Sequence, residues 1–567
     1  MGRYLPAGMP GFHLDYPEGA TVGDLLAGSA RRFPDHVALR DGDLTLTYAE
    51  LYAAARRVAG GLRGLGVGRG ETVALHLPNS AWFTVGYYGI LLAGAVVTPV
   101  NPALPAALLR DQLDEAGVVA VLSHPTTVAR LAEAAAPGVR LVVLVPATHA
   151  APGEVPDGLP ATTYARFEDL LDAEPMHDRE VGPDDVAQLS FTGGTTGRSK
   201  AVIALHRNVV ANTIQTVCFR GGALPAVDEE GGIYVEPVPG AANPHISAPG
   251  AGTVVALAPL FHAMGLISQN TNVLGGAEVI MFGRFEPSRF VETIEQRGVT
   301  GLPGSPALFH ALLAVPGIED HDLSSVKVVN SGAAPIETAT LERLSEVFPN
   351  ALVVEGYGLT EATMCLTLHP LEPGVVPKGS VGAPVFDTEL SIHELGGGPE
   401  LPVGETGEVW ARGPQITVGY RNHPELTAEQ YVDGWLRTGD LGRLDEDGWL
   451  YLVGRAKDML IYKGYNVYPS PLEELLVRHP AVAQASVIGA PQPDVGEIPV
   501  AFVVPAPSYA GRADSLAEEL MAYVAERVAP YSRIREVVLV DALPTSAAGK
   551  VLKTELRASY QRVGVPG

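Results

Sequence analysis

The first 150 residues alternate helix-like patterns with short, continuously apolar runs, and this alternation constrains the fold more than any other feature. The runs TVALHL, VVAVLS and LVVLV occupy residues 72–77, 118–123 and 141–145. A strand that is apolar along its whole length has both faces buried, which is typical of a parallel sheet covered by helices. The sequence therefore predicts an α/β fold with a parallel or mostly parallel sheet.

A helix is predicted to begin after Thr47, where Thr47 and Glu50 have the spacing of a capping box. The following residues place one apolar face at helical spacing: Leu51, Ala55, Val58 and Leu62. The segment 64–70, GLGVGRG, leads from this helix into the next strand. Its glycines alternate, so it is interpreted as a turn and not as a dinucleotide-binding loop.

The uncharged, largely apolar stretch at residues 82–100 has the length of a membrane span, but glycines and Pro99 interrupt it. We interpret it as a buried helix that ends near Gly94, followed by a buried strand. The N-terminus lacks the basic and then apolar pattern of a secretion signal. The prediction is a cytoplasmic protein without a transmembrane segment.

Composition narrows the classes of ligand. Lys and Arg total 39 against 64 Asp and Glu, a formal charge of −25, which disfavours nucleic acid as a partner because phosphate backbones require clustered cations. A small anionic ligand stays compatible, since a few local donors can overcome a repulsive net charge. The two cysteines, Cys218 and Cys365, indicate neither a zinc module nor a disulfide framework.

The C-terminal half contains a break and a second domain. Residues 221–252 are rich in Gly, Pro and Ala and predict a surface loop or lid. The stretch GRLDEDGWLYLVG, from Gly442, predicts a hairpin that turns at DEDG; the spaced oxygens of a calcium loop are missing there. The strand and helix signals after Gly454 predict a smaller α+β domain, and we place the boundary between residues 1–456 and 457–567.

The stretch FTGGTTGRSK, residues 191–200, combines glycines, hydroxyl side chains and a closing lysine. Glycines let backbone N–H groups turn inward around an anion, and hydroxyls add donors. The loop therefore suits a polyphosphate. It is not a Walker A motif, because only three residues separate Gly193 from Gly197 and Arg198 stands where that motif has lysine.

Further motifs follow in order: NSGAAP at 330–335, EGYGLTE at 355–361, WLRTGDLG at 435–442, GRAKDMLIYKGYNVYP at 454–469 and LPTSAAGK at 543–550. With FTGGTTGRSK they resemble the adenylate-forming superfamily of acyl-CoA synthetases, peptide-synthetase adenylation domains and luciferases. The resemblance covers nearly the whole chain. It implies a large N-terminal domain of doubly wound α/β subdomains plus a β-barrel-like subdomain, and a small mobile α+β C-terminal domain.

The resemblance also implies roles for individual residues. Lys550 would bridge the substrate carboxylate and the α-phosphate of ATP, Thr360 would reach the α-phosphate, and Glu361 would hold Mg²⁺. The phosphates would be wrapped by Thr192, Gly193, Gly194, Thr195, Thr196, Gly197 and Lys200. Adenine and ribose would be held by Gly332, Ala333, Ala334, Glu355, Gly356, Tyr357, Gly358, Asp440 and Arg455.

The family's second half-reaction implies a further set of residues. The C-terminal domain would rotate about Lys457 to present another face, on which Lys463 and Gly464 would admit the pantetheine arm of coenzyme A. His262 and Gly265, in APLFHAMGL, would lie at the acyl pocket and the thiol tunnel. A buried histidine with structural hydrogen bonds is the alternative for His262.

The implied reaction is carboxylic acid plus ATP plus CoA giving acyl-CoA, AMP and pyrophosphate. TGGTTG resembles the long-chain fatty acyl-CoA synthetase branch. No aspartate precedes APLFHAMGL as a partner for an α-ammonium, and no carrier-protein domain is evident after Lys550. These features favour a hydrophobic non-amino acid, either a medium- or long-chain fatty acid or a bulky natural-product acid. The alternatives left open are an aryl-acid CoA ligase, an enzyme that loads a carrier protein, a luciferase-type oxygenase and a non-catalytic nucleotide binder; a homodimer is also left open.

Overall fold

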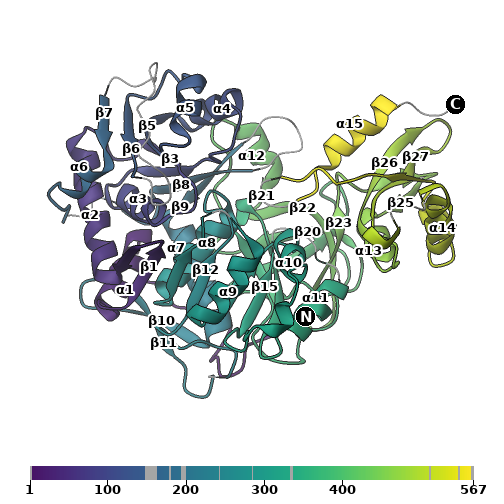
Figure 1. The fold of residues 1–567 in the computed structure, drawn as a ribbon, viewed down its shortest axis with the longest axis horizontal. Coiled ribbons are helices and arrows are strands. Elements are labelled where there is room, and N and C mark those ends of the chain that lie inside the picture. Colours follow the sequence, from purple (N-terminus) through teal and green to yellow (C-terminus); the bar gives the residue numbers. More distant parts are fainter. Residues whose placement is uncertain are drawn as a thin grey trace.

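The computed structural model describes residues 3–146, 163–177, 181–192, 200–241, 243–283, 285–332, 336, 338–509, 513–546 and 550–563. Within them, two large sheets with helices packed against them form the body of the molecule, and a smaller domain lies beside it at the C-terminal end (Figure 1).

The first sheet is the parallel sheet that the apolar runs predict. Its strand order is β7-β6-β5-β3-β4-β8-β9, and its pairs are parallel except for β8 with β9. The bounds are β3 (Thr72–His76), β4 (Val96–Pro99), β5 (Val118–Ser123), β6 (Leu141–Leu144), β7 (Thr163–Arg166), β8 (Val186–Phe191) and β9 (Ala201–Leu205).

The second sheet has the order β18-β17-β16-β15-β14-β12-β13-β1-β2, parallel from β1 to β16 and antiparallel at both ends. The bounds are β1 (Val37–Asp41), β2 (Leu44–Thr47), β12 (Thr253–Ala256), β13 (Glu278–Met281), β14 (Gly301–Gly304), β15 (Val328–Ser331), β16 (Leu352–Gly358), β17 (Cys365–Leu368) and β18 (Ala383–Pro384).

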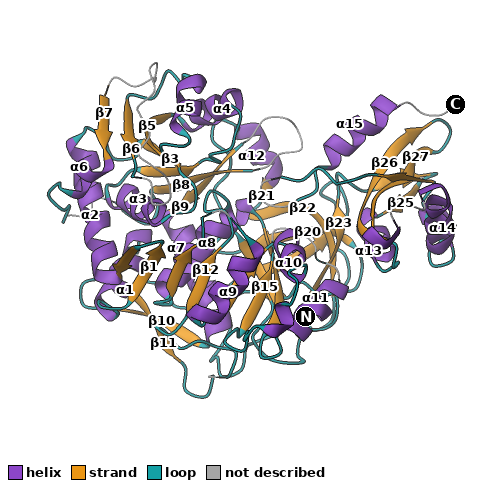
Figure 2. Ribbon diagram, in the orientation of Figure 1, coloured by secondary structure: helices purple, strands orange, loops and turns teal. Residues whose placement is uncertain are grey.

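Helices lie between and around these sheets (Figure 2). They are α1 (Val22–Arg32), α2 (Tyr48–Gly64), α3 (Ala81–Leu92), α4 (Ala106–Ala116), α5 (Val128–Ala134), α6 (Phe167–Leu171), α7 (His206–Gly221), α8 (Ala263–Leu274), α9 (Pro287–Arg297), α10 (Pro306–Leu313), α11 (Thr338–Val347) and α12 (Pro424–Gln430), with 3₁₀ turns at Ile318–Asp320 and Thr360–Ala362.

One hydrophobic core joins the two sheets, because residues of β1, β3, α3 and α7 belong to the same buried cluster. Helix α3 carries the uncharged run and is buried almost throughout, so the prediction of a buried helix followed by a strand is confirmed. Its polar groups are satisfied inside the core: Thr84 bonds to Gln269 at 2.7 Å and Tyr88 to Asn270 at 2.8 Å. Among the described residues, no helix has both the length and the apolar character needed to cross a bilayer.

The prediction for residues 221–252 was wrong in one respect. Part of this segment is a hairpin of β10 (Ala223–Val227) and β11 (Ile233–Pro237), and it packs against α1. The contact is tight, because a Cβ on Gly28 would lie 2.0 Å from the carbonyl oxygen of Ile233. Arg31 also pairs with Asp228 at 2.6 Å. The hairpin is therefore anchored on the core.

An antiparallel sheet follows, made of β19 (Glu389–His393), β20 (Gly407–Arg412), β21 (Tyr431–Val432), β22 (Trp435–Leu444) and β23 (Leu450–Arg455). The predicted hairpin at DEDG is the β22–β23 connection, where the Asp445 carboxylate accepts hydrogen bonds from the N–H groups of Asp447 and Trp449. Asp445 is thus a turn residue, as expected.

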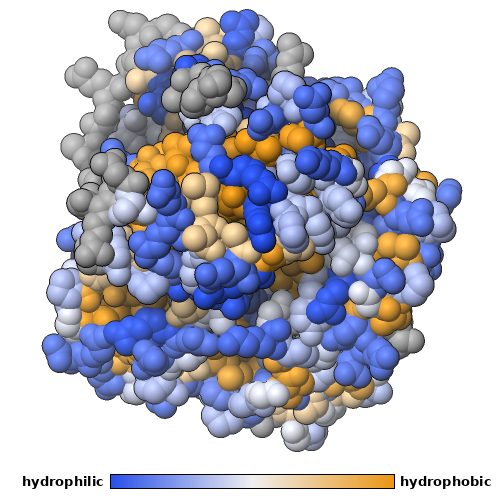
Figure 3. All heavy atoms as spheres, turned by 90° about the vertical axis from the view of Figure 1, so that its right-hand side faces the viewer, coloured by the Kyte–Doolittle hydropathy of each residue, from blue (hydrophilic) through white to orange (hydrophobic). Residues whose placement is uncertain are grey.

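The C-terminal domain is α+β, as predicted. Its sheet consists of β24 (Leu460–Tyr462), β25 (Tyr465–Val467), β26 (Val482–Gln492), β27 (Gly496–Pro505) and β28 (Glu536–Leu539), packed with α13 (Pro469–Val477), α14 (Ala513–Ala525) and α15 (Lys553–Val563), with 3₁₀ turns at Pro507–Tyr509 and Pro530–Ser532. Figure 3 looks onto this side of the molecule and shows hydrophilic side chains interspersed with hydrophobic patches. The mixed α/β fold with a large and a small domain is the predicted fold class.

Candidate active site

Three predicted ribose and adenine residues meet at the edge of the antiparallel sheet. Asp440 on β22 pairs in register with Arg455 on β23, and Arg455 Nε lies 3.1 Å from Asp440 Oδ1. The Tyr357 hydroxyl donates to Asp440 Oδ2 at 2.8 Å. The Asp440 carboxylate is mostly buried yet ionically paired, so it is fixed as a hydrogen-bond acceptor, which suits a diol such as ribose.

Strand β16 supplies the backbone beside this corner, and its glycines are sterically required. A Cβ on Gly358 would lie 1.5 Å from the carbonyl oxygen of Met364, and one on Gly356 would lie 2.8 Å from Leu368. Gly332, at the end of the neighbouring strand, is similarly close to Met264, at 3.3 Å. Small residues here leave the narrow space that a flat base needs.

Glu355 lies on the same strand at the boundary with the C-terminal domain. Burial, and then the negative charge of Glu474 on α13, raise the pKa of the Glu355 carboxyl to about 7. Its backbone N–H donates to His369 Nδ1, and the His369 N–H donates back to the Glu355 carbonyl. Glu355 therefore connects strand β16 to the interface between the large domain and the C-terminal domain.

The described ends of the phosphate loop are held together by β8 and β9. The Thr192 N–H donates to the Lys200 carbonyl at 3.2 Å. Lys200 Nζ lies 5.4 Å from the centre of the Tyr420 ring, and the Tyr420 hydroxyl donates to Glu361 Oε1 at 2.7 Å. An amine, an aromatic ring and a carboxylate thus form a chain that links the loop to the segment carrying Thr360.

Five predicted loop residues and two adenine-site residues lie outside the described residues: Gly193, Gly194, Thr195, Thr196, Gly197, Ala333 and Ala334. Their roles stay predictions.

Lys550 reaches this corner from the C-terminal domain. Its backbone N–H donates to Ser546 Oγ at 3.2 Å, and an isolated bridge pairs Thr545 with Val551. Burial, together with the charge of Arg455, lowers the pKa of the Lys550 amine to about 8. Asp440 and Asp458 oppose this shift, and Lys553 reinforces it. Because Asp440 and Arg455 act on Lys550 electrostatically, the amine lies near the corner formed by Tyr357, Asp440 and Arg455. We call these three residues the nucleotide corner.

His262 faces the same amine and also caps a helix. It is the N-cap of α8, and its Nδ1 accepts a hydrogen bond from the Met264 N–H at 3.3 Å. Burial and the charge of Lys550 lower the pKa of His262. Gly265, one residue after Met264, is required sterically, because a Cβ there would lie 2.1 Å from the Pro259 carbonyl oxygen.

The predicted hinge and thiol-side residues lie on the surface. Lys457 is exposed between β23 and β24. Lys463 and Gly464 form the exposed two-residue turn of the β24–β25 hairpin, with φ of 50° and 84°, the conformation of a type I′ turn. In this arrangement the chain brings Lys550, and not Lys463 or Gly464, to the nucleotide corner.

The donors near Glu361 fit a magnesium ion that is shared with phosphates. Mg²⁺ is usually bound by one or two carboxylates and substrate phosphates, not by an all-protein cage. Within the described ranges, no three His, Cys, Asp or Glu side chains come together as a metal site. Among the described residues, only Oε1 of the Glu361 carboxylate accepts a hydrogen bond, which agrees with that mode of binding.

A cavity of about 300 Å³ lies between the nucleotide corner and the helices α7 and α8, a size at the lower end for small-molecule sites. Its apolar wall includes Val217, Val254, Ile267, Leu302 and Leu368. His245, Ile246, Ser247, Ala248 and Gly252, from the 221–252 segment, also line it, while His262 and Gly265 are not among the described lining residues. We call this space the acyl cavity.

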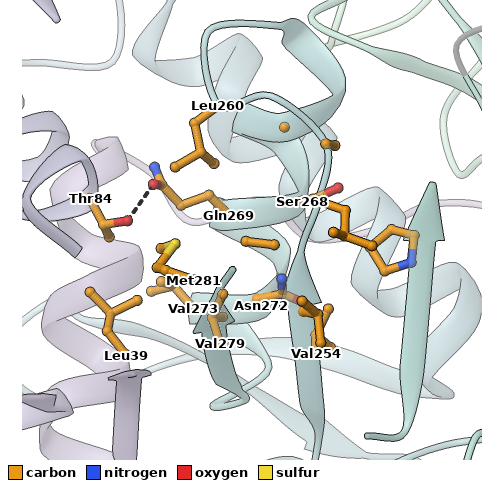
Figure 4. A pocket seen from close by; sticks show the side chains of 16 residues that line it. Leu39, Thr84, Val254, Leu260, Ser268, Gln269, Asn272, Val273, Val279 and Met281 are labelled. Atoms are coloured by element: carbon orange, nitrogen blue, oxygen red, sulfur yellow. Dashed lines mark hydrogen bonds between the residues drawn. The ribbon is translucent and has the colours of Figure 1, made fainter. Parts of the chain in front are cut away.

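A much smaller cavity lies behind this wall, at about 20 Å³ (Figure 4). Thr84 donates to Gln269 Oε1 there, and Gln269 Nε2 has no protein partner in the described part of the chain. Such a volume holds about one water molecule. Ser268, Asn272 and Val254 separate it from the acyl cavity, since they line both.

The corner of Tyr357, Asp440 and Arg455, the lysine that faces it and the adjoining cavity agree with the class that the resemblance implies, enzymes that activate carboxylic acids with ATP. Comparison with known proteins agrees. The family described as "AMP-binding enzyme" matches residues 26–421, and "AMP-binding enzyme C-terminal domain" matches residues 471–550. The chain therefore belongs to the AMP-binding enzyme family, as the resemblance predicted.

Similar proteins include 4-coumarate-CoA ligase 1 from Narcissus pseudonarcissus, 34% identical over 93% of this chain and 91% of that protein. 4-coumarate–CoA ligase 5 from Oryza sativa subsp. japonica is 35% identical over 94% of this chain and 93% of that protein. Among solved structures, an anthranilate CoA ligase, AuaEII, in complex with anthranoyl-AMP is 25% identical with a TM-score of 0.83, covering 96% of this chain and 98% of that one. The ATP-bound MatB from Rhodopseudomonas palustris is 27% identical with a TM-score of 0.81, covering 95% and 99%. The chain is an AMP-forming acid–thiol ligase, an ATP-dependent acyl-CoA ligase of the adenylate-forming type.

Sequence reasoning missed Tyr420 and the polar residues of the acyl cavity. Tyr420 comes next to Lys200 because the segment 418–421 pairs with β9, through a Val202–Tyr420 bridge and an Arg421 N–H to Ala201 carbonyl bond of 2.9 Å. No local pattern marks that pairing across more than 200 residues. Asn330 and Ser331 were inside a recognised motif, but only its glycine and alanines had been given roles.

Proposed function

We propose that this enzyme activates a compact aryl carboxylic acid and transfers it to coenzyme A. The single observation that supports this best is the cavity of about 300 Å³, with a mostly apolar lining, next to the nucleotide corner. A flat ring fills such a volume well, whereas a long alkyl chain requires a longer tunnel. The names of the relatives point the same way, so the aryl-acid alternative is preferred to a fatty acid.

In the first half-reaction, a carboxylate oxygen of the acid attacks the α-phosphorus of ATP and pyrophosphate leaves. Asp440 and Arg455 hold the ribose, Tyr357 packs on adenine, and the segment from Thr192 to Lys200 binds the outer phosphates. Glu361 would hold Mg²⁺, which would supply positive charge to the phosphate oxygens. Thr360 donates to the α-phosphate.

Lys550 lowers the barrier of this step electrostatically. Two anions must approach each other, and an ammonium placed between them in a water-poor site stabilises the transition state without reorganisation. This role is supported by the proximity of Lys550 to Asp440, Arg455 and His262, with which its amine interacts electrostatically.

In the second half-reaction, the thiol of coenzyme A attacks the acyl carbon and AMP leaves. We place the domain boundary at residues 456 and 457, and propose that the C-terminal domain rotates about Lys457. The turn at Lys463 and Gly464 then replaces Lys550 at the site, and its lack of a Cβ at Gly464 leaves room for the pantetheine arm.

The test is a panel of aryl and fatty acids scored by pyrophosphate release with and without coenzyme A, together with Lys550→Ala. We expect aryl acids to be preferred and acyl-CoA to accumulate over many turnovers. Lys550→Ala should lose adenylate formation while it still forms thioester from supplied acyl-adenylate. Equal loss of both half-reactions in a folded variant would refute the division of labour, and turnover only with a carrier protein would refute the acceptor.

A further inference from the structure

One charged side chain in the acyl cavity has no ionic partner. Arg220, at the C-terminal end of α7, lines the cavity. Its Nε donates to the His369 carbonyl at 3.1 Å, and its Nη2 donates to the Glu355 carbonyl at 3.0 Å. Across the described residues, no carboxylate comes within ion-pair distance of this guanidinium.

The nearby carboxyl of Glu355 does not serve as that partner. An adjacent guanidinium would lower the pKa of a carboxyl, yet the pKa of Glu355 is raised to about 7, by burial and by Glu474. Arginine cannot neutralise itself by losing a proton. A buried cation without a counter-charge is costly, so such groups are normally paired.

Another polar atom of this cavity also lacks a partner. His245 lines the cavity, and its Nδ1 has no hydrogen-bond partner in the described structure. Ser331 Oγ has none either. Ser331 shares its face of the sheet with Val329, which belongs to the core on the other side, so its hydroxyl points away from the cavity.

This polar end of the cavity is separate from the reacting end. The charges that act on Lys550 are those of Arg455, Asp440, Asp458 and Lys553, and Arg220 is not among them. Arg220 is also fixed by different elements, since it bridges α7 to β16 and to His369, just after β17. The acid that binds here therefore meets Lys550 at one end and Arg220 at another.

We propose that the acid carries a second carboxylate at its far end, and that Arg220 binds it. A carboxylate accepts hydrogen bonds from the guanidinium and supplies the missing counter-charge. The Oδ1 atom of Asn330, also without a partner in the described residues, is an acceptor and does not itself bind an anion. The inference rests on the proposed function and adds to it a substrate class, aryl dicarboxylic acids.

The test compares acids that share one skeleton and differ only at the far end: cinnamate, 4-methylcinnamate, 4-coumarate and 4-carboxycinnamate. The readout is kcat/KM for pyrophosphate release, with the thioester position assigned by NMR. We expect 4-carboxycinnamate to exceed 4-methylcinnamate about tenfold to a hundredfold, the range of a charge-assisted hydrogen bond.

Variants then assign the preference to the guanidinium. Arg220→Gln should bring the ratio of the two acids to one or below, and Ser331→Ala, at a side chain on the other face of the sheet, should leave the ratio unchanged. Val217→Ala, which enlarges the same cavity without changing its charge, should leave the ratio in place. A ratio within one protein does not depend on how much of a variant is folded.

Each outcome of these measurements either supports or overturns the proposal of a second carboxylate. Preference for 4-methylcinnamate or 4-coumarate in the wild type, or a ratio that survives Arg220→Gln, overturns the second carboxylate while leaving aryl-CoA ligase activity established. If no member of the panel releases pyrophosphate, the proposed function itself fails.

Discussion

The protonation of Lys550 should control the alkaline limb of adenylate formation. Burial and Arg455 lower its pKa to about 8, while Asp440 and Asp458 keep the pKa from falling further. The active form is the ammonium, so activity should be present below pH 8 and lost above it. In the free enzyme about one tenth of the lysine is protonated one pH unit above its pKa, and about one hundredth two units above.

The size of the expected loss of activity follows from this protonated fraction. The kcat/KM for adenylation reports the free enzyme, so it should fall about tenfold per pH unit above 8. Bound ATP and acid carboxylate are anions that favour the ammonium and raise the same pKa. The decline of kcat should therefore begin at a higher pH than the decline of kcat/KM.

The assay is pyrophosphate release without coenzyme A, between about pH 6.5 and 10, because omitting the thiol removes its own ionisation from the profile. Lys550→Arg retains its charge throughout this range, so it should be slower but lack the decline. Lys378→Arg, at an exposed lysine that pairs with Glu342, is the matched control and should behave as the wild type. A wild-type kcat/KM that stays level to pH 9, or the same decline in Lys550→Arg, would refute the assignment.

Three further outcomes are expected. Tyr357→Phe removes one of the hydrogen bonds that hold Asp440, so the KM for ATP should rise about tenfold with little change in the thermal midpoint; an unchanged KM would show that Asp440 needs no such support. Gly358→Ala forces a Cβ to 1.5 Å from a carbonyl oxygen, so it should abolish both half-reactions or folding. Gly64→Ala, in open space on α2, should instead be neutral or stabilising by about 0.5–1 kcal/mol. Equal melting curves for these two variants would contradict the steric argument. The folded-state pKa of Glu355 is raised to about 7, so its contribution to the free energy of unfolding is present at low pH and is lost as the pH rises through 7. Glu355→Gln should therefore flatten the fall of the thermal midpoint between about pH 5 and 8. A variant whose midpoint falls in parallel with that of the wild type would argue against this.

Local patterns predicted the elements whose stability is local. The helix α2 begins at the predicted cap, with Thr47 accepting from the Glu50 N–H and Glu50 bonding back. Its predicted face is buried. The strands β3, β5 and β6 start at the predicted residues, because an apolar run that is buried on both faces has one stable environment.

The β10–β11 hairpin could not be predicted in the same way. Its strands contain Pro225 and Pro237 and are joined through a glycine-containing turn, so their local signal is that of a loop. What stabilises them is tertiary: the close contact of Ile233 with Gly28, and the pairing of Arg31 with Asp228. Neither partner is visible from within the segment.

The residues of the candidate site also fall into two groups: those that local motifs indicate and those that only tertiary contacts reveal. The motifs supplied Asp440, Tyr357 and Lys550 through resemblance, and the structure brings these three together. Tyr420 and Arg220 depend on contacts across sheets, with Glu361 and with the carbonyls of Glu355 and His369. A single arginine at the end of a helix pattern is normally a surface residue, and only the structure shows it facing a cavity.

The two cations of the acyl region also differ in a way that suits their places. Lysine shifts its pKa readily when buried, and Lys550, at about 8, is only partly charged until anions arrive. Its charge thus grows with the negative oxygens that it must stabilise. Arg220 stays charged at every physiological pH, because even its lowered pKa is about 10, and its planar fork is already fixed by two backbone carbonyls. A permanent, preorganised cation suits a group that is bound but does not react. The chemistry of each side chain therefore agrees with a reacting end at Lys550 and a recognition end at Arg220.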